Sequence, residues 1–419
     1  MTLAVELIER TLDARLERGA GRPLAVALSG GGDSLALLLL AKAWADRHGR
    51  PLVALTVDHC LQPQSTAWAG WCAARAADLG VAHTILVWDG PKPARGLPAA
   101  ARGARHRLIA DAARQAGAKV ILFGHTADDV IESQLMSAAG VRISPPAAWS
   151  PSPVWPEGRD LFILRPLIAV RRVAIRAWLV ARGETWIDDP ANEDMRHPRA
   201  RARAAMTDAT VESESAAPAS QQVFDRPAIG PSGEISLPLK NRNSKSCGLP
   251  RLGSALVCVA GSERPPRRGA LERVATRLAA GGVVEATLGG ARVVQTPDQL
   301  ILARETGDAR GRACRPMALR AGEQQVWDGR FEVRAHAPGL ILTALHGHAA
   351  RLAEGQRRAL SGLHPAARAA LPAVIDEHGA VVCSTLTPDP RLEIRSLVGG
   401  RLAGASGAID SEVKIGVYS

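Results

Sequence analysis

The chain has 419 residues, a length typical of two or three domains rather than one. Its 46% hydrophobic and 22% charged residues exclude a globally disordered chain, and its longest apolar run, Leu35 to Ala41, is too short to cross a bilayer. Lysine and arginine outnumber aspartate and glutamate by 52 to 41; the resulting charge of +11 favours a polyanionic partner such as nucleic acid, although a compositional bias toward arginine explains the excess equally well.

The N-terminal segment and the cysteines indicate the compartment. Residues 3–18 carry charges among their apolar positions, which predicts an amphipathic helix rather than a secretory signal. The six cysteines include no C-x-x-C pair, so the usual spacing of zinc ribbons and redox pairs is missing. We therefore expect reduced thiols in a cytoplasmic protein that has no membrane partner.

The first half of the chain alternates short apolar runs with alanine-rich stretches of helical length. The runs cover 24–28, 52–57, 84–87, 120–124 and 161–164, and the helical stretches cover 33–48, 63–79 and 99–116. Such alternation predicts an α/β fold with a parallel five-stranded sheet and helices on both faces, the last run forming an edge strand. Ligands of such sheets bind beyond the carboxyl ends of the strands.

The alternation of apolar runs and helical stretches ends after this region. Residues 144–158 form a Pro-rich loop, and residues 168–182 return to helical periodicity. We predict a catalytic domain over 1–204, a polar linker or poorly ordered insertion over 205–249, and a smaller α+β region over 250–419.

The C-terminal region begins with a predicted helix over 268–279. Hairpin strands follow, with turn signals at Gly289–Gly290 and Pro297–Asp298. The region is therefore expected to mix helices with antiparallel strands.

The first apolar run leads into a glycine-rich turn and then a helix. The turn is Ser29-Gly30-Gly31-Gly32-Asp33-Ser34. Its glycines let successive N–H groups point inward, and the helix N-terminus adds positive potential, so the turn predicts a pyrophosphate-binding nest. It is not a Walker loop, and Asp33 is expected to hold Mg²⁺ against phosphate oxygens. The alternative is an aspartate that caps the helix beside a flexible glycine turn.

This turn resembles the S-G-G-x-D-S signature of the PP-loop ATP pyrophosphatases. The resemblance implies a Rossmann-like nucleotide-binding fold and cleavage of ATP between its α and β phosphates. Further motifs are similar to those of one group within this superfamily, the tRNA(Ile)-lysidine synthases. They are Val57-Asp58-His59, Ala100 to Arg107, Gly124 to Glu132, Leu164-Arg165-Pro166-Leu167, Asp188 to Asn192, the arginines at 199, 201 and 203, and, more weakly, Trp327 to Glu332.

The family resemblance implies an ATP-dependent ligase of tRNA modification. Such an enzyme adenylates C2 of the wobble cytidine of a CAU-anticodon isoleucine tRNA, and free L-lysine then attacks to give lysidine, AMP and pyrophosphate. The substrates and cofactors expected here are therefore ATP, Mg²⁺, lysine and that tRNA, with the C-terminal region contacting tRNA. The oligomeric state stays open, a homodimer included.

The candidate site residues follow from these motifs. The expected catalytic residues are Asp33, Arg105, Asp129 and Glu132, and Asp129 and Glu132, at i and i+3 on one helix face, would also bind the ammonium of lysine. ATP contacts are expected from Ser29, Gly30, Gly31, Gly32, Asp33, Ser34, Thr56, Gly124 and His125, and tRNA contacts from Arg102, Arg107, Arg199, Arg201 and Arg203. The alternative roles are structural: Asp128 caps a helix, His125 is a buried residue at a strand end, and the arginines are surface charges.

Four positions depart from the family pattern. Cys60 and Gln62 replace the glycine and arginine of V-D-H-G-L-R, Ser137 replaces an arginine, and Ala200 replaces an asparagine. These departures favour one alternative, a PP-loop protein that binds tRNA with impaired turnover. A second alternative, a PP-loop tRNA thiolase, is expected to use a C-x-x-C pair, which this chain lacks.

Overall fold

The computed structural model describes residues 2–141, 143, 145–189, 201, 227–239, 249–307 and 314–418. They form two compact units. The first unit contains the described residues from 2 to 201 together with Ile409–Val417, and the second contains those from 227 to Ala408 together with Tyr418.

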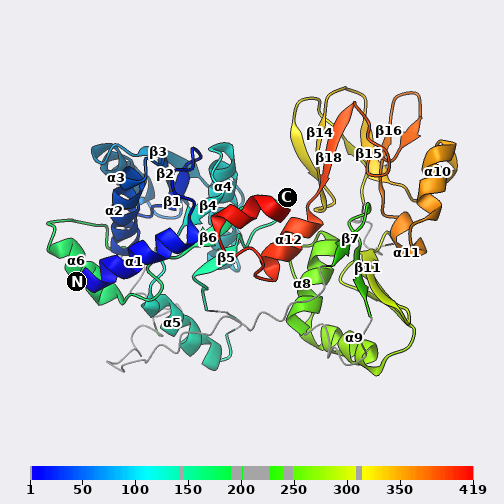
Figure 1. The fold of residues 1–419 in the computed structure, drawn as a ribbon. Coiled ribbons are helices and arrows are strands. Elements are labelled where there is room, and N and C mark those ends of the chain that lie inside the picture. The colour runs from blue at the N-terminus through cyan, green and yellow to red at the C-terminus, as the bar shows by residue number, and fades with distance from the viewer. Residues whose placement is uncertain are drawn as a thin grey trace. The chain divides into compact units, whose positions relative to one another are not determined.

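The first unit is built on one six-stranded sheet in the order β3-β2-β1-β4-β6-β5 (Figure 1). Its strands are β1 (Leu24–Ala27), β2 (Leu52–Asp58), β3 (Ala82–Val87), β4 (Val120–Leu122), β5 (Trp149–Pro151) and β6 (Phe162–Leu164). All neighbouring pairs except β5 with β6 are parallel, which confirms the predicted five-stranded parallel sheet.

The edge of the sheet differs from the prediction. Three residues of the Pro-rich segment, Trp149–Pro151, pair antiparallel with β6, so β6 is not the edge strand. An edge position tolerates Pro151 because its missing N–H faces away from the ladder. Trp149 also stacks on Phe162 at 5.1 Å between ring centroids.

Helices cover both faces of this sheet. The described helices of this unit are α1 (Thr2–Arg15), α2 (Gly32–Arg47), α3 (Ser65–Asp78), α4 (Leu97–Gln115), α5 (Ala127–Ala138) and α6 (Arg172–Val180). Ala25, Leu55 and Ile121 pack in one core cluster with Ile109 and Ala113 of α4, while α2 and α3 lie on the opposite face (Figure 1). In the described part of the chain, no helix is long and apolar enough to span a membrane.

The strand order positions the site. From β1 the chain moves outward through β2 to β3, then returns to β4 on the other side of β1. The strand order therefore reverses between β1 and β4, and ligands of doubly wound sheets bind in the crevice at such a reversal.

A short segment near the C-terminus packs on the first unit. Glu412, in the 3₁₀ helix η3 (Glu412–Tyr418), accepts hydrogen bonds from Arg50 at 2.6 and 2.7 Å and from Arg22 at 2.9 Å. The side chains of Arg50 and Glu412 are both 0% exposed. Burial disfavours the Glu412 carboxylate, but Arg50 and Arg22 lower its pKa below the usual value. The Trp149 indole N–H also donates to the Ile409 carbonyl at 2.8 Å.

The second unit combines three antiparallel sheets with five helices and a short 3₁₀ turn among its described residues. The strands are β7 (Ala228–Ile229), β8 (Ile235–Pro238), β9 (Val284–Leu288), β10 (Ala291–Gln295), β11 (Gln299–Arg304), β12 (Met317–Ala318), β13 (Gln324–Trp327), β14 (Phe331–Ala335), β15 (Ile341–Ala344), β16 (Pro372–Ile375), β17 (Val381–Val382) and β18 (Leu392–Ser396). The helices are α8 (Leu249–Ala260), α9 (Arg268–Ala280), α10 (Glu354–Ser361), α11 (Pro365–Arg368) and α12 (Val398–Ala405), with the turn η2 (Ala349–Arg351). The predicted helix and hairpins are α9 and β9–β11.

Part of the segment predicted as a linker is ordered. Within 205–249, residues 227–239 form β7 and β8, and β8 pairs with β11. Ile235 is fully buried against α8, and Ile229 and Leu237 pack on the same core. These alternating apolar residues bury one face of the hairpin, which explains why a polar-looking segment enters the sheet.

The family-like motif at Trp327–Glu332 is the turn between β13 and β14. Asp328 accepts hydrogen bonds from Arg304 at 2.9 and 3.0 Å and from Arg330 at 2.8 Å. The Arg330 side chain is 0% exposed and also donates to the Ser232 carbonyl at 2.6 Å. The motif therefore stabilises the interior of the second unit.

Candidate active site

The predicted phosphate loop, Ser29–Ser34, follows β1 and runs into α2, which begins at Gly32. Ser34 fixes its shape: the Ser34 hydroxyl oxygen accepts from the Ser29 N–H at 3.1 Å and donates to the Gly31 carbonyl at 2.9 Å. Gly30 has φ +83°, a conformation that favours glycine. The turn thus has the compact glycine backbone that an anion nest requires.

Residues after α6 pack behind this loop. The Ile187 N–H donates to the Gly30 carbonyl at 3.0 Å, and a Cβ at Gly30 would lie only 2.5 Å from Ile187 Cδ1. A Cβ at Gly32 would lie 3.4 Å from the Trp186 ring. Trp186 and Ile187, which support the loop, lie just before the predicted Asp188 to Asn192 motif and belong to no predicted motif themselves.

The second predicted motif forms the first turn of α5. Asp129 accepts hydrogen bonds from the N–H of Thr126 at 2.8 Å and from its hydroxyl at 3.1 Å. Asp128 points elsewhere: it accepts from the Arg172 N–H at 2.6 Å and pairs with the Arg171 guanidinium at 3.3 Å. Asp128 therefore caps α6 rather than α5, a variant of the capping alternative.

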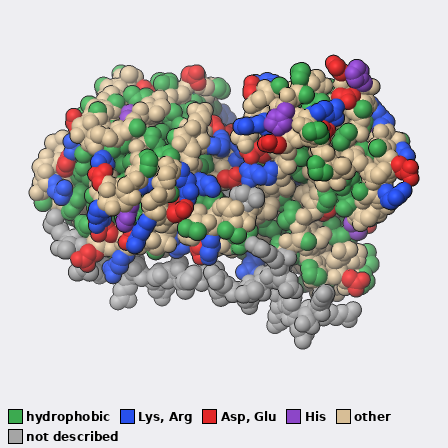
Figure 2. Space-filling model, turned by 45° about the horizontal axis from the view of Figure 1, so that its top comes forward, with side chains coloured by type: hydrophobic (Ala, Val, Ile, Leu, Met, Phe, Trp, Pro, Cys, Tyr) green, Lys and Arg blue, Asp and Glu red, His purple; other side chains and the backbone are tan. Residues whose placement is uncertain are grey.

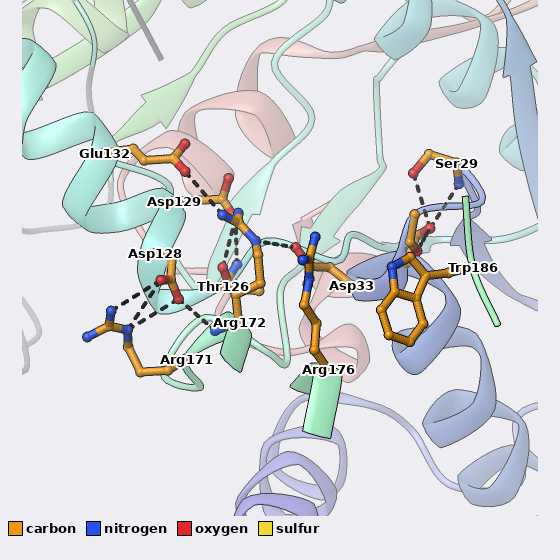
Figure 3. Close-up of polar contacts among 12 residues, drawn as sticks. Ser29, Asp33, Thr126, Asp128, Asp129, Glu132, Arg171, Arg172, Arg176 and Trp186 are labelled. Carbon is orange, nitrogen blue, oxygen red and sulfur yellow. Dashed lines mark hydrogen bonds and ion pairs between the residues drawn. The ribbon is translucent and has the colours of Figure 1, made fainter. Parts of the chain in front are cut away.

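The side chain of Arg172 joins the loop to α5. Its guanidinium donates to Asp33 Oδ2 at 2.9 Å and to Glu132 Oε1 at 3.2 Å, and lies 3.5 Å from Asp129 Oδ2 (Figure 3). The structure thus brings together three predicted site carboxylates around Arg172, which was not among the predicted site residues. The only sequence signal was a pair of arginines before an amphipathic helix.

Burial and ion pairing compete in this cluster. Burial raises the pKa of Asp33, and the charge of Arg172 offsets part of that rise. Burial also disfavours the Asp129 carboxylate, but the Thr126 hydrogen bond and the charge of Arg172 bring the pKa of Asp129 below its usual value. In turn, these carboxylates raise the pKa of Arg172 against the effect of burial.

The opposite side of the site is basic and aromatic. His125, directly after β4, stacks over Phe123 at 5.9 Å, and Phe123 stacks over His106 of α4 at 5.3 Å. Burial lowers the pKa of His125 to about 3, and the charges of Arg165 and Arg105 act in the same direction. His125 is therefore a neutral imidazole at pH 7, and the positive charge beside it comes from arginines.

Neither Thr56 nor Gly124 offers a free polar side chain to a ligand: the Thr56 hydroxyl is bonded within the protein, and Gly124 has no side chain. The buried Thr56 hydroxyl donates to the Leu28 carbonyl at 2.8 Å and contacts His83 Nε2 at 2.8 Å. A Cβ at Gly124 would lie 3.0 Å from the Asp33 carbonyl oxygen. The absence of a side chain at Gly124 lets β4 approach the phosphate loop closely.

The predicted tRNA contacts are all arginines: Arg102, Arg107, Arg199, Arg201 and Arg203. Arg102 and Arg201 are exposed, and Arg107 forms an ion pair with Glu157 at 3.5 Å. Arg199 and Arg203 lie outside the described residues. Figure 2 shows further arginine and lysine side chains on the visible surface, with acidic side chains among them.

The departures from the family pattern have different structural settings. Cys60 has φ +51°, so a non-glycine residue adopts the conformation that the family's glycine favours, at a cost of about 1 to 2 kcal/mol. Ser137 is exposed near the end of α5, and Gln62 is half-buried. Ala200 lies outside the described residues. The five described cysteines form no disulfide.

Asp33 is chemically suited to Mg²⁺. Its carboxylate belongs to the phosphate loop, and its side chain is 22% exposed, so an ion held by phosphate oxygens can reach it. One carboxylate combined with substrate phosphates is a common magnesium site. Among the described residues, no group of three or more His, Cys, Asp or Glu side chains is arranged to hold a metal ion.

Comparisons with known proteins agree with this geometry. A family model described as a PP-loop domain matches residues 5–210. The tRNA(Ile)-lysidine synthase of Caulobacter vibrioides is 44% identical over 98% of this chain and 99% of its own length. The tRNA(Ile)-lysidine synthase of Hyphomonas neptunium is 37% identical over 71% of this chain and 86% of its own length. That of Rhizobium meliloti is 32% identical over 95% of this chain and 87% of its own length.

Proposed function

This chain belongs to the tRNA(Ile)-lysidine synthase family, and from that premise we propose that its site uses ATP to join lysine to C2 of the wobble cytidine of a CAU-anticodon isoleucine tRNA. The products are lysidine-containing tRNA, AMP and pyrophosphate, so the chain is an ATP-dependent ligase. One observation carries the proposal: Asp33 of the phosphate loop and the Asp129–Glu132 pair all contact the Arg172 guanidinium. The sites for nucleotide and lysine therefore adjoin.

The Ser29–Ser34 loop binds the β and γ phosphates of ATP in this proposal. Its backbone N–H groups and the N-terminus of α2 stabilise the negative charge of the departing pyrophosphate. The main chain near Thr56 and Gly124 borders the adenine, and His125 contacts the nucleotide as a neutral donor or acceptor. Asp33, together with phosphate oxygens, would hold Mg²⁺, which would neutralise charge on the leaving group.

Asp129 and Glu132 bind the lysine ammonium and accept its proton. Free lysine has a pKa of about 10.4, so at neutral pH its amine is a poor nucleophile until a base removes a proton. The amine then attacks C2 of the adenylated cytidine, and AMP leaves with the former C2 oxygen. Arg105 supports this step because its positive charge lies beside His125, where it can stabilise the α-phosphate.

The tRNA is held through its phosphates. The proposed contacts in the first unit are Arg102, Arg107, Arg199, Arg201 and Arg203. The second unit is proposed to bind a further part of the tRNA, which accords with the charge of +11 spread over the chain.

A reconstituted reaction tests the proposal. The full chain is incubated with ATP, Mg²⁺, lysine and an isoleucine tRNA with a CAU anticodon, and the anticodon cytidine is analysed by mass spectrometry. We expect one lysine per tRNA and an equal amount of pyrophosphate. Pyrophosphate release without lysine incorporation would contradict the proposal.

Removing the Asp33 carboxylate tests the phosphate-loop assignment. Asp33→Ala should abolish pyrophosphate release and leave tRNA retention on a filter largely intact, because the tRNA contacts lie on other residues. Asp46→Ala is the control: Asp46 lies on the same helix, is 61% exposed and pairs with Lys42 at the surface. Unchanged turnover in Asp33→Ala would refute the role of this carboxylate.

A further inference from the structure

Arg172 lies where carboxylates with two different proposed roles meet. Its Nε donates to Asp33 at 2.9 Å, and its two Nη atoms lie 3.2 Å from Glu132 and 3.5 Å from Asp129. Figure 3 shows the guanidinium between the carboxylates of α5 and that of Asp33. One cation therefore contacts both the nucleotide carboxylate and the lysine carboxylates.

Three carboxylates in this cluster share one guanidinium. Asp33, Asp129 and Glu132 all contact Arg172, and the charge of Arg176 also acts on Asp33. In a partly buried setting, carboxylates attract cations more strongly than they do in water. The lysine carboxylates are therefore suited to exchange the Arg172 guanidinium for another cation.

The lysine carboxylates are covered in this arrangement. The side chains of Glu132 and Asp129 are 0% and 10% exposed, and Arg172, at 19%, lies over them. A bound ammonium must contact carboxylate oxygens directly to offset its lost hydration. Lysine cannot reach this pair while the guanidinium occupies it.

Resting on the proposed function, we propose that Arg172 is a positioning residue that occupies the lysine carboxylates until a nucleotide binds. ATP in the Ser29–Ser34 loop places several negative charges beside Asp33. A guanidinium forms charge-assisted and often bidentate hydrogen bonds with phosphate oxygens. Arg172 then pairs with the phosphates and releases Asp129 and Glu132 to the lysine ammonium, so nucleotide binds first and lysine second.

Arg171 provides a matched control. It is the neighbouring residue and carries the same charge, but its guanidinium pairs with Asp128, which caps α6, and its side chain is 43% exposed. Replacing Arg171 removes one positive charge from the same region without changing the cluster around Arg172.

Isothermal titration of lysine into the full chain tests the order of binding. Lysine affinity is measured with and without α,β-methylene ATP and Mg²⁺. In the wild type we expect the nucleotide analogue to tighten lysine binding about tenfold. Arg172→Gln should bind lysine without nucleotide about as tightly as the wild type does with it, so the ratio of the two affinities falls to about one. Arg171→Gln should keep the wild-type ratio.

A charge-retaining variant guards against misfolding of Arg172→Gln. Arg172→Lys keeps the positive charge, but an ammonium cannot contact all three carboxylates as the planar guanidinium does. The ratio of lysine affinities with and without nucleotide should therefore lie between one and the wild-type value. A wild-type ratio of one, or a wild-type ratio preserved in both Arg172 variants, would overturn this inference. If lysine is incorporated into tRNA but the ratio is one, the inference alone fails. If lysine neither binds nor is incorporated, the proposed function fails with it.

Discussion

Gly124 lies where the end of β4 meets the first turn of α2. A Cβ at this position would lie 3.0 Å from the carbonyl carbon and oxygen of Asp33 and 3.1 Å from the Ser34 nitrogen. These are backbone atoms, so the close contact can be relieved only by a shift of backbone, either of the phosphate loop or of the end of β4. We expect Gly124→Ala to weaken binding of an ATP analogue by about tenfold or more, which corresponds to about 1.4 kcal/mol.

Titration calorimetry with the nucleotide analogue measures this effect. Gly21→Ala is the matched control, because a Cβ there meets no atom within 4 Å and its φ is not positive. Equal affinities for the Gly124→Ala variant and the wild type would show that the loop tolerates a shift of β4.

At the scale of single residues, the motif carboxylates were predictable and their partner was not. Asp33, Asp129 and Glu132 occupy motif positions that follow two of the predicted parallel strands, and ligands bind beyond the carboxyl ends of such strands. Arg172 is one of 46 arginines in the chain, so no count or local pattern distinguishes it. Its role arises only because α6 begins beside α5, and this packing is not encoded by local periodicity.

Burial of His106, which stacks on Phe123, contributes to the pH dependence of stability in the first unit. His106 is 4% exposed and lies 5.3 Å from the Phe123 ring. Burial lowers the pKa of His106 to about 2, and the charges of Arg105 and Arg102 add to that effect. An unfolded histidine has a pKa of about 6.5 and takes up a proton below that pH, whereas the folded one stays neutral. The free energy of unfolding should therefore fall as the pH drops below 6.5.

Two variants separate titration from packing at His106. His106→Phe removes the titrating group and keeps the ring, so the loss of unfolding free energy between pH 7.5 and pH 5 should shrink by about 1 to 2 kcal/mol. His106→Gln should show the same weaker pH dependence but be less stable at pH 7.5, because it loses the ring contact. Urea denaturation at the two pH values measures both effects. A pH dependence as steep as that of the wild type would contradict the buried neutral histidine.

At the scale of elements, alternation of apolar runs with helical stretches was sufficient for the parallel sheet and its helices. The same pattern did not predict the strand β5 or the β7–β8 hairpin. Both lie in segments rich in proline or polar residues, where only two to four residues enter the ladder. Such short strands are specified by the neighbouring strand that they pair with, and a single-sequence pattern does not contain that information.

At the scale of the whole molecule, the Arg50–Glu412 pair joins distant parts of the sequence within the first unit. Both side chains are 0% exposed, so Glu412→Gln leaves the Arg50 charge buried without its counter-ion. We expect a loss of about 3 to 5 kcal/mol in the free energy of unfolding. The surface pair of Glu9 and Arg47 is the control, since Arg47 is 52% exposed and Glu9→Gln should cost at most about 1 kcal/mol.

Chemical denaturation of the full-length variants, followed by far-ultraviolet circular dichroism, measures the difference. Equal losses in Glu412→Gln and Glu9→Gln would mean that Arg50 finds another acceptor when Glu412 is neutral.

The two residues of this buried ion pair are synthesised at very different times during translation. Arg50 and Glu412 are 362 positions apart, and all of the second unit up to Ala408 is translated between them. At about 5 to 20 residues per second, the nascent first unit waits roughly 20 to 70 s on the ribosome for the residue that neutralises its buried arginine. Until residue 412 is made, the Arg50 guanidinium lacks the counter-ion that it has in the folded unit, and a truncated product that ends before residue 412 lacks it permanently.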